Sequence, residues 1–205
     1  MTNSVNQVIN FEKTVLDESI ETDLSGLTSA WKDLIEAGEF IRPGSLLIVN
    51  GVNIMDAAFA SKAGFNVTLK DISCCETNLI EELLCSSPEV KLIDENIFSK
   101  ESSRYSNFDY VYETAFSLIL PSERKNYIQS LSRLIKPGGR LITIFVPNNK
   151  NGENESASVN AVVYHKIAAE FLKLEFSSKY LLSSKKSKKE EVLQVYIKPV
   201  EQAGI

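Results

Sequence analysis

Short, mostly apolar runs that alternate with segments of helical character constrain the fold of this chain more than any other feature. Five such runs cover residues 45–49, 65–69, 90–93, 108–112 and 140–146. Each is too short for a helix, and continuous apolar character is typical of a strand buried on both faces of a parallel sheet. Strands that alternate with helices indicate an α/β fold with a doubly wound parallel sheet.

Helical segments and turn residues fill the gaps between these runs. Helices are expected over residues 31–40, 55–62, 74–85, 121–135 and 159–172. Gly38, Gly64 and the turn Lys136-Pro137-Gly138-Gly139 end three of them. Two later runs, 176–182 and 192–197, flank a charged stretch and predict a hairpin at the sheet edge. The lysines of that stretch, 185–189, fit a solvated loop that protects an edge, although a localisation signal or an RNA-binding patch is the alternative.

The 205-residue length is that of one domain, preceded by a less regular N-terminal segment. Residues 1–30 are polar with scattered apolar positions, and they carry only a weak helical pattern. We therefore divide the chain into residues 1–30, a candidate lid over the site, and a domain over residues 31–205.

Charge and composition exclude several classes of protein. The formal net charge is −5, so the chain lacks the broad positive field that holds nucleic acid, and no nucleic-acid partner is expected. No run approaches the roughly 20 apolar residues that cross a bilayer, and residues 1–11 hold no secretory signal, so a cytoplasmic protein is expected. The three cysteines have no metal-ligand spacing, and one histidine, His165, makes a Ser-His-Asp hydrolase hard to build. No metal site is predicted, and the oligomeric state stays open.

The ends of the predicted strands nominate a ligand site. In an open parallel sheet, ligands bind beyond the carboxyl ends of the strands. Asn50, Gly51 and Asn53 follow the first strand, Asp71 ends the second, Asp94, Glu95 and Asn96 follow the third, and Glu113 ends the fourth. These residues include carboxylates but no lysine or arginine, so a phosphate would be poorly held. A positively charged ligand with ribose hydroxyls fits better.

Asp71 is the sharpest single candidate among them. It lies twenty residues after Gly51, at the end of the second strand. A carboxylate there can accept hydrogen bonds from both hydroxyls of a ribose. The structural alternative is a helix cap, but Ser73 already occupies the capping position, with Glu76 three residues later.

Residues 45–147 resemble the core of class I S-adenosylmethionine-dependent methyltransferases, and within them the thiopurine and thiol methyltransferase-like group. The resemblance is carried by residues 108–113, by residues 120–124, and by the stretch through Leu134 that ends in the Lys136–Gly139 turn before the fifth strand. It extends from Trp31 to the C-terminus and leaves residues 1–30 unmatched. It implies a Rossmann-like seven-stranded sheet, mostly parallel, with an antiparallel last strand.

The resemblance also implies a cofactor, a reaction and site residues. S-adenosylmethionine would be the methyl donor, and a small-molecule thiol or similar soft nucleophile the favoured acceptor. Contacts to the acceptor would come from the N-terminal segment and from the polar loop over residues 147–158. Asp71 and Ile72 match the segment that holds the cofactor ribose, and Asn96 and Ile97 the segment that touches the adenine. Glu113 falls where the family has an acid near cofactor and substrate. Asn50, Gly51 and Asn53 belong to the loop that approaches the cofactor, and no catalytic base can be named.

One motif departs from the family pattern. Where the family carries Gly-x-Gly-x-Gly, this chain has Gly51-Val52-Asn53-Ile54-Met55, although Asp56 matches an acid common in the group. Asn53 tolerates left-handed backbone geometry, whereas the Met55 side chain is expected to enter the space of the cofactor's methionine moiety. The alternative is therefore a catalytically impaired methyltransferase-like protein that acts as a ligand-binding or regulatory partner subunit. A dehydrogenase is a weaker alternative, because the pyrophosphate-binding glycines are missing.

Overall fold

The fold is a seven-stranded sheet with helices on both faces. The computed structural model describes residues 28–49, 54–70, 84–85, 88–93, 107–145, 161–183 and 188–200. The strand order is β3-β2-β1-β4-β5-β7-β6. The strands are β1 (Ser45–Val49), β2 (Asn66–Lys70), β3 (Lys91–Ile93), β4 (Phe108–Glu113), β5 (Ile135–Phe145), β6 (Lys173–Ser183) and β7 (Lys188–Ile197).

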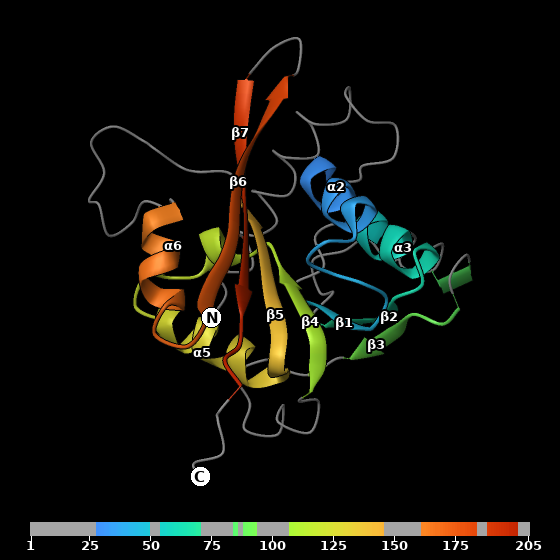
Figure 1. Ribbon diagram of the computed structural model, residues 1–205, viewed down its shortest axis with the longest axis horizontal. Helices are drawn as coiled ribbons and strands as arrows, with labels where there is room; N and C mark the ends of the chain where they lie inside the picture. Colours follow the sequence, from blue (N-terminus) through green and yellow to red (C-terminus); the bar gives the residue numbers. More distant parts are fainter. Residues whose placement is uncertain are drawn as a thin grey trace.

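The pairing of these strands confirms the fold predicted from the sequence. Strands β1 to β5 pair in parallel, whereas β7 runs antiparallel to both β5 and β6. The hairpin formed by β6 and β7 stands at one edge of the sheet, as the two late apolar runs indicated (Figure 1).

None of the described helices has the length and apolar character that spanning a membrane would require.

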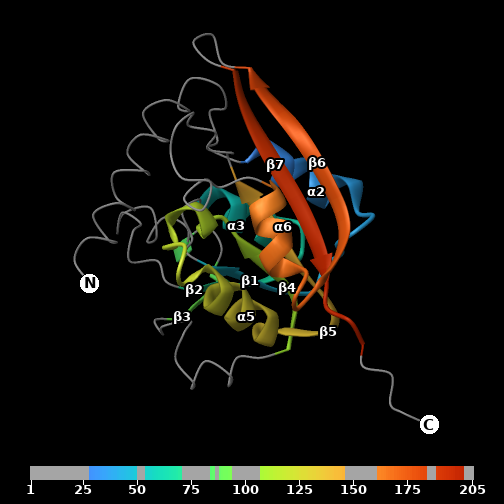
Figure 2. The same ribbon diagram turned by 90° about the vertical axis from the view of Figure 1, so that its left-hand side faces the viewer.

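Each face of the sheet is covered by its own pair of helices. Helices α2 (Ser29–Ala37) and α3 (Ile54–Lys62) lie on one face, and α5 (Arg124–Leu134) and α6 (Ala161–Ala168) lie on the other (Figures 1 and 2). A short helix, η2 (Phe116–Leu118), connects β4 to α5. Two apolar cores result, one under each helix pair.

The alternation of side chains along each strand decides which core they enter. In β1, Leu46 and Ile48 join the core under α2 and α3, whereas Leu47 and Val49 join the core under α5 and α6. We call the core under α2 and α3 the first core. The same alternation at the end of β4 places Tyr112 in this first core. Its neighbour Glu113 therefore points to the opposite face of the sheet.

The main difference from the predicted elements lies at the Lys136–Gly139 turn. The structure continues β5 back through this turn to Ile135, with an irregularity in its pairing to β4. Ile135 is opposite Phe108 and Arg140 is opposite Tyr110, so extra residues bulge out between the two pairs. Gly138 adopts a φ of 79° within the bulge. The glycines thus serve a bulge inside a strand rather than a turn before one.

Smaller differences concern the ends of the other elements. Helix α2 ends at Ala37 because Gly38 caps it in a left-handed conformation, whereas the apolar pattern suggested Phe40. Strands β6 and β7 extend beyond the predicted 176–182 and 192–197, because polar residues at the ends of a hairpin do not interrupt its backbone pairing. Of the predicted helix 74–85, only residues 84–85 are described, and they are helical.

Candidate active site at the carboxyl edge of the sheet

The order of the strands places a ligand-binding edge next to β1. Strand β1 has β2 on one side and β4 on the other, so the chain reverses its direction of winding there. Such a switch point opens a crevice at the carboxyl ends of the strands. Most predicted ligand residues follow these strand ends in sequence but lie outside the described residues, and their roles stay predictions: Asn50, Gly51, Asn53, Asp71, Ile72, Asn96 and Ile97.

Glu113 is the predicted site residue that the structure describes, and its carboxylate is fully buried. It is the last residue of β4, and Oε2 accepts hydrogen bonds from the backbone N–H groups of Ala115 (3.0 Å) and Phe116 (3.1 Å). The Tyr127 hydroxyl donates to the same oxygen at 3.2 Å, and the Thr143 hydroxyl donates to Oε1 at 2.5 Å. These donors tie the end of β4 to η2, α5 and β5.

The electrostatics of Glu113 follow from this burial. Burial raises the pKa of the carboxyl group, whereas the hydroxyls of Thr143, Tyr164 and Tyr127 lower it. Because both carboxylate oxygens already accept hydrogen bonds from the protein, the observed geometry fits a residue that fixes the shape of the edge. Its assignment as a cofactor ligand stays a prediction.

A second buried carboxylate, Asp56, lies on the opposite face of the sheet, in the first turn of α3. Its Oδ1 accepts a hydrogen bond from the backbone N–H of Thr28 at 2.9 Å. Its Oδ2 accepts from the hydroxyls of Thr28 at 2.8 Å and Tyr112 at 2.9 Å. Burial raises the pKa of Asp56 to about 6, against the lowering effect of the hydrogen bonds from Thr28 and Tyr112.

An aromatic pair packs beside Asp56. The rings of Trp31 and Tyr112 are stacked, with centroids 4.2 Å apart and planes 2° from parallel. The indole Nε1 of Trp31 donates a hydrogen bond to the backbone oxygen of Asp56 at 3.1 Å. Helix α2 is therefore held to the end of β4 and the start of α3 by both apolar and polar contacts.

Glu191 adds a third carboxylate on the same face as Asp56. It is the residue of β7 just before Val192, which pairs with the last residue of β5, Phe145. Its Oε2 is buried and accepts no hydrogen bond from the described part of the chain. Burial and the nearby charge of Asp56 raise the pKa of Glu191 to about 7.

Sequence reasoning missed Tyr112, Thr28 and Glu191 as parts of this edge. Tyr112 was counted only as an apolar strand residue, and Glu191 lies in a charged stretch that favours a loop. Lys70 was also overlooked: it is the last residue of β2 and is buried. Alternate residues of a strand lie on the same face of the sheet, so Glu191 shares its face with the core residues Leu193 and Val195. This alternation could have identified Glu191 from the sequence.

The altered glycine loop is described only from Ile54 onward. Met55 lies in the first turn of α3, and its side chain is 43% exposed. It is thus accessible at the edge where the cofactor was expected, and its predicted effect on the cofactor is neither confirmed nor contradicted.

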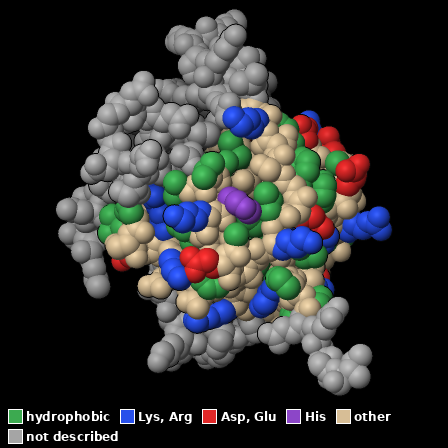
Figure 3. Space-filling view, turned by 60° about the vertical axis from the view of Figure 1, so that its left-hand side comes forward, with side chains coloured by type: hydrophobic (Ala, Val, Ile, Leu, Met, Phe, Trp, Pro, Cys, Tyr) green, Lys and Arg blue, Asp and Glu red, His purple; other side chains and the backbone are tan. Residues whose placement is uncertain are grey.

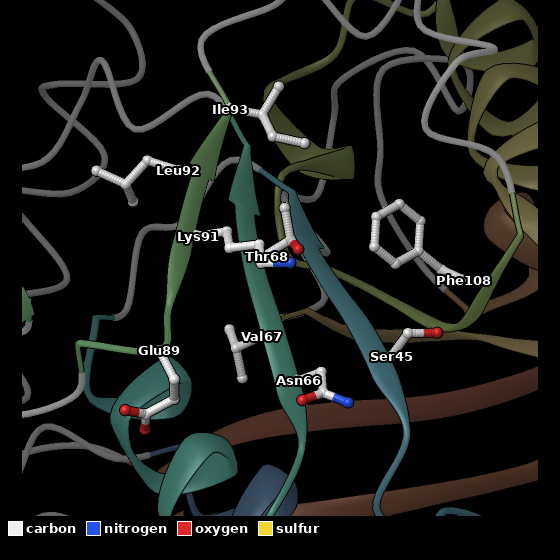
Figure 4. Close-up of a pocket in the computed structure, with 9 residues that line it drawn as sticks. All are labelled: Ser45, Asn66, Val67, Thr68, Glu89, Lys91, Leu92, Ile93 and Phe108. Carbon is white, nitrogen blue, oxygen red and sulfur yellow. The ribbon is translucent and has the colours of Figure 1, made fainter.

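A cavity of 660 Å³ extends from the amino ends of β1 and β2 to Ile93, the last residue of β3 (Figure 4). Ser45 and Asn66, the first residues of those strands, line it together with Thr68, Lys91 and Phe108. The switch point lies at the carboxyl ends of β1 and β4, whereas this cavity reaches those two strands only at their first residues, Ser45 and Phe108, so it is not the candidate active site.

The single histidine is also remote from the edge. His165 belongs to α6, and its Nδ1 lies 3.4 Å from the hydroxyl of Tyr196 in β7. Figure 3 shows the histidine at the surface with lysine and arginine side chains on the same face. It therefore does not supply a base to the carboxyl edge of β1 and β4.

The observed sheet order agrees with the fold that the resemblance to S-adenosylmethionine-dependent methyltransferases implies. A match to a family model specifies the family: the model described as thiopurine S-methyltransferase (TPMT) matches residues 46–198. The chain belongs to this family. The match spans the sheet from β1 to β7, as the resemblance seen in the sequence implied.

Solved structures share the fold at low sequence identity. A TehB-like SAM-dependent methyltransferase from Corynebacterium glutamicum is 17% identical, with a TM-score of 0.61, and the alignment covers 96% of this chain and 98% of that one. The 1,6-didemethyltoxoflavin-N1-methyltransferase from Burkholderia thailandensis, with bound S-adenosylhomocysteine, is 14% identical with a TM-score of 0.71, covering 94% and 88%. The N-methyltransferase NodS from Bradyrhizobium japonicum, also with S-adenosylhomocysteine, is 13% identical with a TM-score of 0.65, covering 94% and 99%.

A search of curated proteins found no match. The family match and the shared fold nevertheless agree on the class of enzyme: the protein is an S-adenosylmethionine-dependent methyltransferase, and S-adenosylmethionine is its cofactor. The comparisons do not favour the alternative of an impaired partner subunit.

Proposed function

We propose that this enzyme transfers a methyl group to a small-molecule thiol or a similar soft nucleophile. The observation that carries the proposal is the family match over residues 46–198, because the matched family is described by methylation of sulfur in thiopurines. A thiol also needs little help from a base, since part of it is ionised near neutral pH. This suits an edge from which the single histidine is absent.

The residues of the edge fit a cationic methyl donor. When bound, S-adenosylmethionine supplies a methyl group on a positively charged sulfur that is readily displaced. Of the described carboxylates, Asp56 has a pKa of about 6 and is therefore mostly ionised at neutral pH, which gives the edge a negative charge for such a cation. We propose Asp71 and Ile72 for the ribose, Asn96 and Ile97 for the adenine, and Asn50, Gly51, Asn53 and Glu113 for the rest of the cofactor. Catalysis would then consist mainly of orientation and exclusion of water.

The donor site is tested by titration calorimetry with S-adenosylmethionine. We expect binding to the wild-type protein and a strong loss of affinity in Asp71→Ala, because the ribose hydroxyls lose their acceptor. Asp109→Ala is the matched control, since Asp109 lies at the opposite end of the sheet, where Ser45 donates to it. Unchanged affinity in Asp71→Ala would exclude the ribose assignment, and no wild-type binding at millimolar donor would exclude the proposed function.

Met55→Gly tests the altered loop in the same assay. Restoring a glycine removes a side chain from the first turn of α3, next to the expected cofactor site. Tighter binding in this variant would show that Met55 restricts the cofactor, whereas weaker binding would show that Met55 contributes contacts.

Glu191 favours an amine as a second candidate acceptor. An amine must release a proton when it is methylated, and a carboxyl group with a pKa of about 7 can accept that proton at neutral pH. Its buried Oε2 has no hydrogen-bond donor among the described residues, so a substrate N–H group would satisfy it. Two of the structural relatives carry N-methyltransferase in their names.

A panel of small thiols and amines separates the two acceptor classes. Under the thiol proposal, S-adenosylhomocysteine forms with thiols, and Glu191→Gln leaves the rate within about threefold. Under the amine proposal, turnover occurs with amines and falls at least tenfold in Glu191→Gln, as loss of a general base predicts. Glu175→Gln is the control, because Glu175 pairs with Arg140 on the surface of the β6–β7 hairpin.

A further inference from the structure

Three elements of the sheet edge meet at one carboxylate. Asp56 lies in the first turn of α3, Thr28 directly precedes α2, and Tyr112 is the residue before the end of β4. The three hydrogen bonds that Thr28 and Tyr112 donate to Asp56 measure 2.8–2.9 Å. We call these three residues the Asp56 anchor. The anchor lies at the carboxyl end of β4, where the proposed ligands bind.

The hydroxyl of Thr28, the residue at the N-cap position of α2, forms an unusual hydrogen bond for that position. An N-cap threonine normally accepts a hydrogen bond from a backbone N–H in the first turn of its own helix. The Thr28 hydroxyl makes no such cap bond to α2 and donates to Asp56 instead. Its backbone N–H also donates to Asp56. The start of α2 is therefore fixed to α3 and β4, at the expense of its own cap.

Apolar packing alone already holds the rest of α2. Ala30, Trp31 and Leu34 are buried in the first core, and Trp31 is stacked on Tyr112. A buried carboxylate is an expensive addition to such a contact, because its charge is removed from water. Its distinctive effect is on position: it sets where the first turn of α2 lies relative to the end of β4.

We propose that Asp56 is a positioning residue for the methyl-transfer site, which holds the start of α2 against the carboxyl end of β4 so that ligand can bind there. This inference rests on the proposed function. Asp56 touches Thr28 and Tyr112 rather than reacting atoms, and it acts through the placement of α2. Loss of the carboxylate should therefore loosen α2 first and weaken ligand binding as a consequence.

Trp31 provides a direct readout of α2, since it is the only tryptophan in the chain. In Asp56→Ala, we expect a red shift of Trp31 emission, at least twofold stronger quenching by acrylamide, and at least tenfold weaker binding of S-adenosylmethionine. Asp109→Ala is the matched control, because Asp109 also accepts hydrogen bonds from a backbone N–H and a hydroxyl, both of Ser45, at the amino end of β4. That control should leave quenching and affinity unchanged.

The pH dependence of quenching separates positioning from simple structural support. The titratable groups of the described residues that face Asp56 are Tyr112 from β4 and Glu191 from β7, whereas α2 offers the neutral Thr28 and Trp31. Burial raises the pKa of Asp56 to about 6, whereas the hydrogen bonds that Thr28 donates from the start of α2 lower it, because they favour the ionised carboxylate. The contact between α2 and Asp56 therefore depends on whether the carboxyl group is ionised. Quenching of wild-type Trp31 should change between pH 5 and pH 8, and this change should be absent in Asp56→Asn.

Three results would overturn the proposal: unchanged Trp31 quenching in Asp56→Ala, unchanged ligand affinity despite a loosened α2, or equal losses of affinity in Asp56→Ala and Asp109→Ala. Tyr112→Phe keeps the stacked ring but removes one donor, so it should reproduce part of the Asp56→Ala effect if the protein cannot tolerate alanine. If the wild-type protein fails to bind S-adenosylmethionine, the proposed function fails. Quenching still decides whether Asp56 fixes α2.

Discussion

Glu113 shows how one side chain can join several elements at the end of a strand. Its carboxylate accepts hydrogen bonds from η2, α5 and β5, and it is fully buried. Removing such an acceptor leaves several buried donors without partners, and each unsatisfied group costs free energy.

We predict that Glu113→Ala lowers the free energy of unfolding by about 3 kcal/mol, since it breaks a buried charged network. Urea denaturation followed by circular dichroism measures this loss. Glu175→Ala should cost less than about 1 kcal/mol, because its pairing with Arg140 is near the surface. A Glu113→Ala loss as small as that of the control would contradict the role of the buried network.

The raised pKa values of Asp56 and Glu191 predict how the free energy of unfolding depends on pH. Burial raises the pKa of Asp56 from 3.8 to about 6 and that of Glu191 from 4.5 to about 7. A raised pKa means that the folded state holds the proton more tightly than the unfolded state, so the stabilisation is complete at low pH and is lost as pH rises to the folded-state values. The window for these two groups is therefore pH 4 to 7.

The expected size of this effect is about 3 kcal/mol for Asp56, at roughly 1.4 kcal/mol for each pKa unit. Asp109 acts in the opposite direction: burial raises its pKa, but hydrogen bonds from Lys136 and Ser45 outweigh burial and lower it, so its contribution is lost in acid. Urea midpoints measured from pH 4 to pH 8 should show a smaller fall in Asp56→Asn than in the wild type. Parallel curves would contradict the assignment.

At the scale of elements, the bulge in β5 depends on a glycine for space. A Cβ added at Gly139 would come within 2.7 Å of both the Asp109 backbone oxygen and the Ile135 Cγ2 atom. We predict that Gly139→Ala lowers the free energy of unfolding by about 2–3 kcal/mol, since backbone cannot move aside cheaply. Gly38→Ala is the control: its Cβ meets no atom within 4 Å, and only its φ of 63° is unfavourable, at about 1 kcal/mol. Equal losses measured by thermal unfolding would contradict the close approach.

The elements that the sequence predicts well are those whose signals are local. The run over residues 45–49 has the same bounds as β1, because a short buried strand is marked by continuous apolar residues and by flanking turn residues. Gly38 was correctly expected to stop α2. The bulge at Gly138 could not be read from the sequence, because the same glycines suit a turn, and only the pairing of Phe108 with Ile135 distinguishes the two.

The candidate site was predictable only in part, for a similar reason. Glu113 could be placed at the carboxyl edge because it ends a strand, and strand ends are local features. The hydrogen bond from Thr28 to Asp56 joins residues 28 positions apart, and that from Tyr112 joins residues 56 apart. Contacts between such distant positions depend on the packing of whole elements and leave no pattern in the sequence.

At the scale of the whole molecule, the residues that form the two cores are distinct from the N-terminal segment proposed as a lid. The described core residues fall between Ala30 and Tyr196, one group on each face of the sheet. The proposed lid, residues 1–30, lies almost entirely before them in the chain. The division into a lid and a domain over residues 31–205 therefore predicts that the lid affects ligand binding more than folding.

A variant that lacks residues 2–27, with Met1 joined to Thr28, tests this division, because a peptide bond still precedes Thr28 and the Asp56 anchor keeps its donors. Without ligand, its unfolding midpoint should lie within about 2 °C of the wild type, since less than about 1 kcal/mol of stability is removed. Donor at 100 times its dissociation constant should stabilise the wild-type protein by about 2.7 kcal/mol, and the same concentration should stabilise the truncated protein much less. Equal ligand-induced shifts in the two proteins, measured by differential scanning fluorimetry, would exclude a lid over the donor. A large fall in the midpoint without ligand would instead assign residues 2–27 to the folded domain, because only residues that pack against the cores can support them.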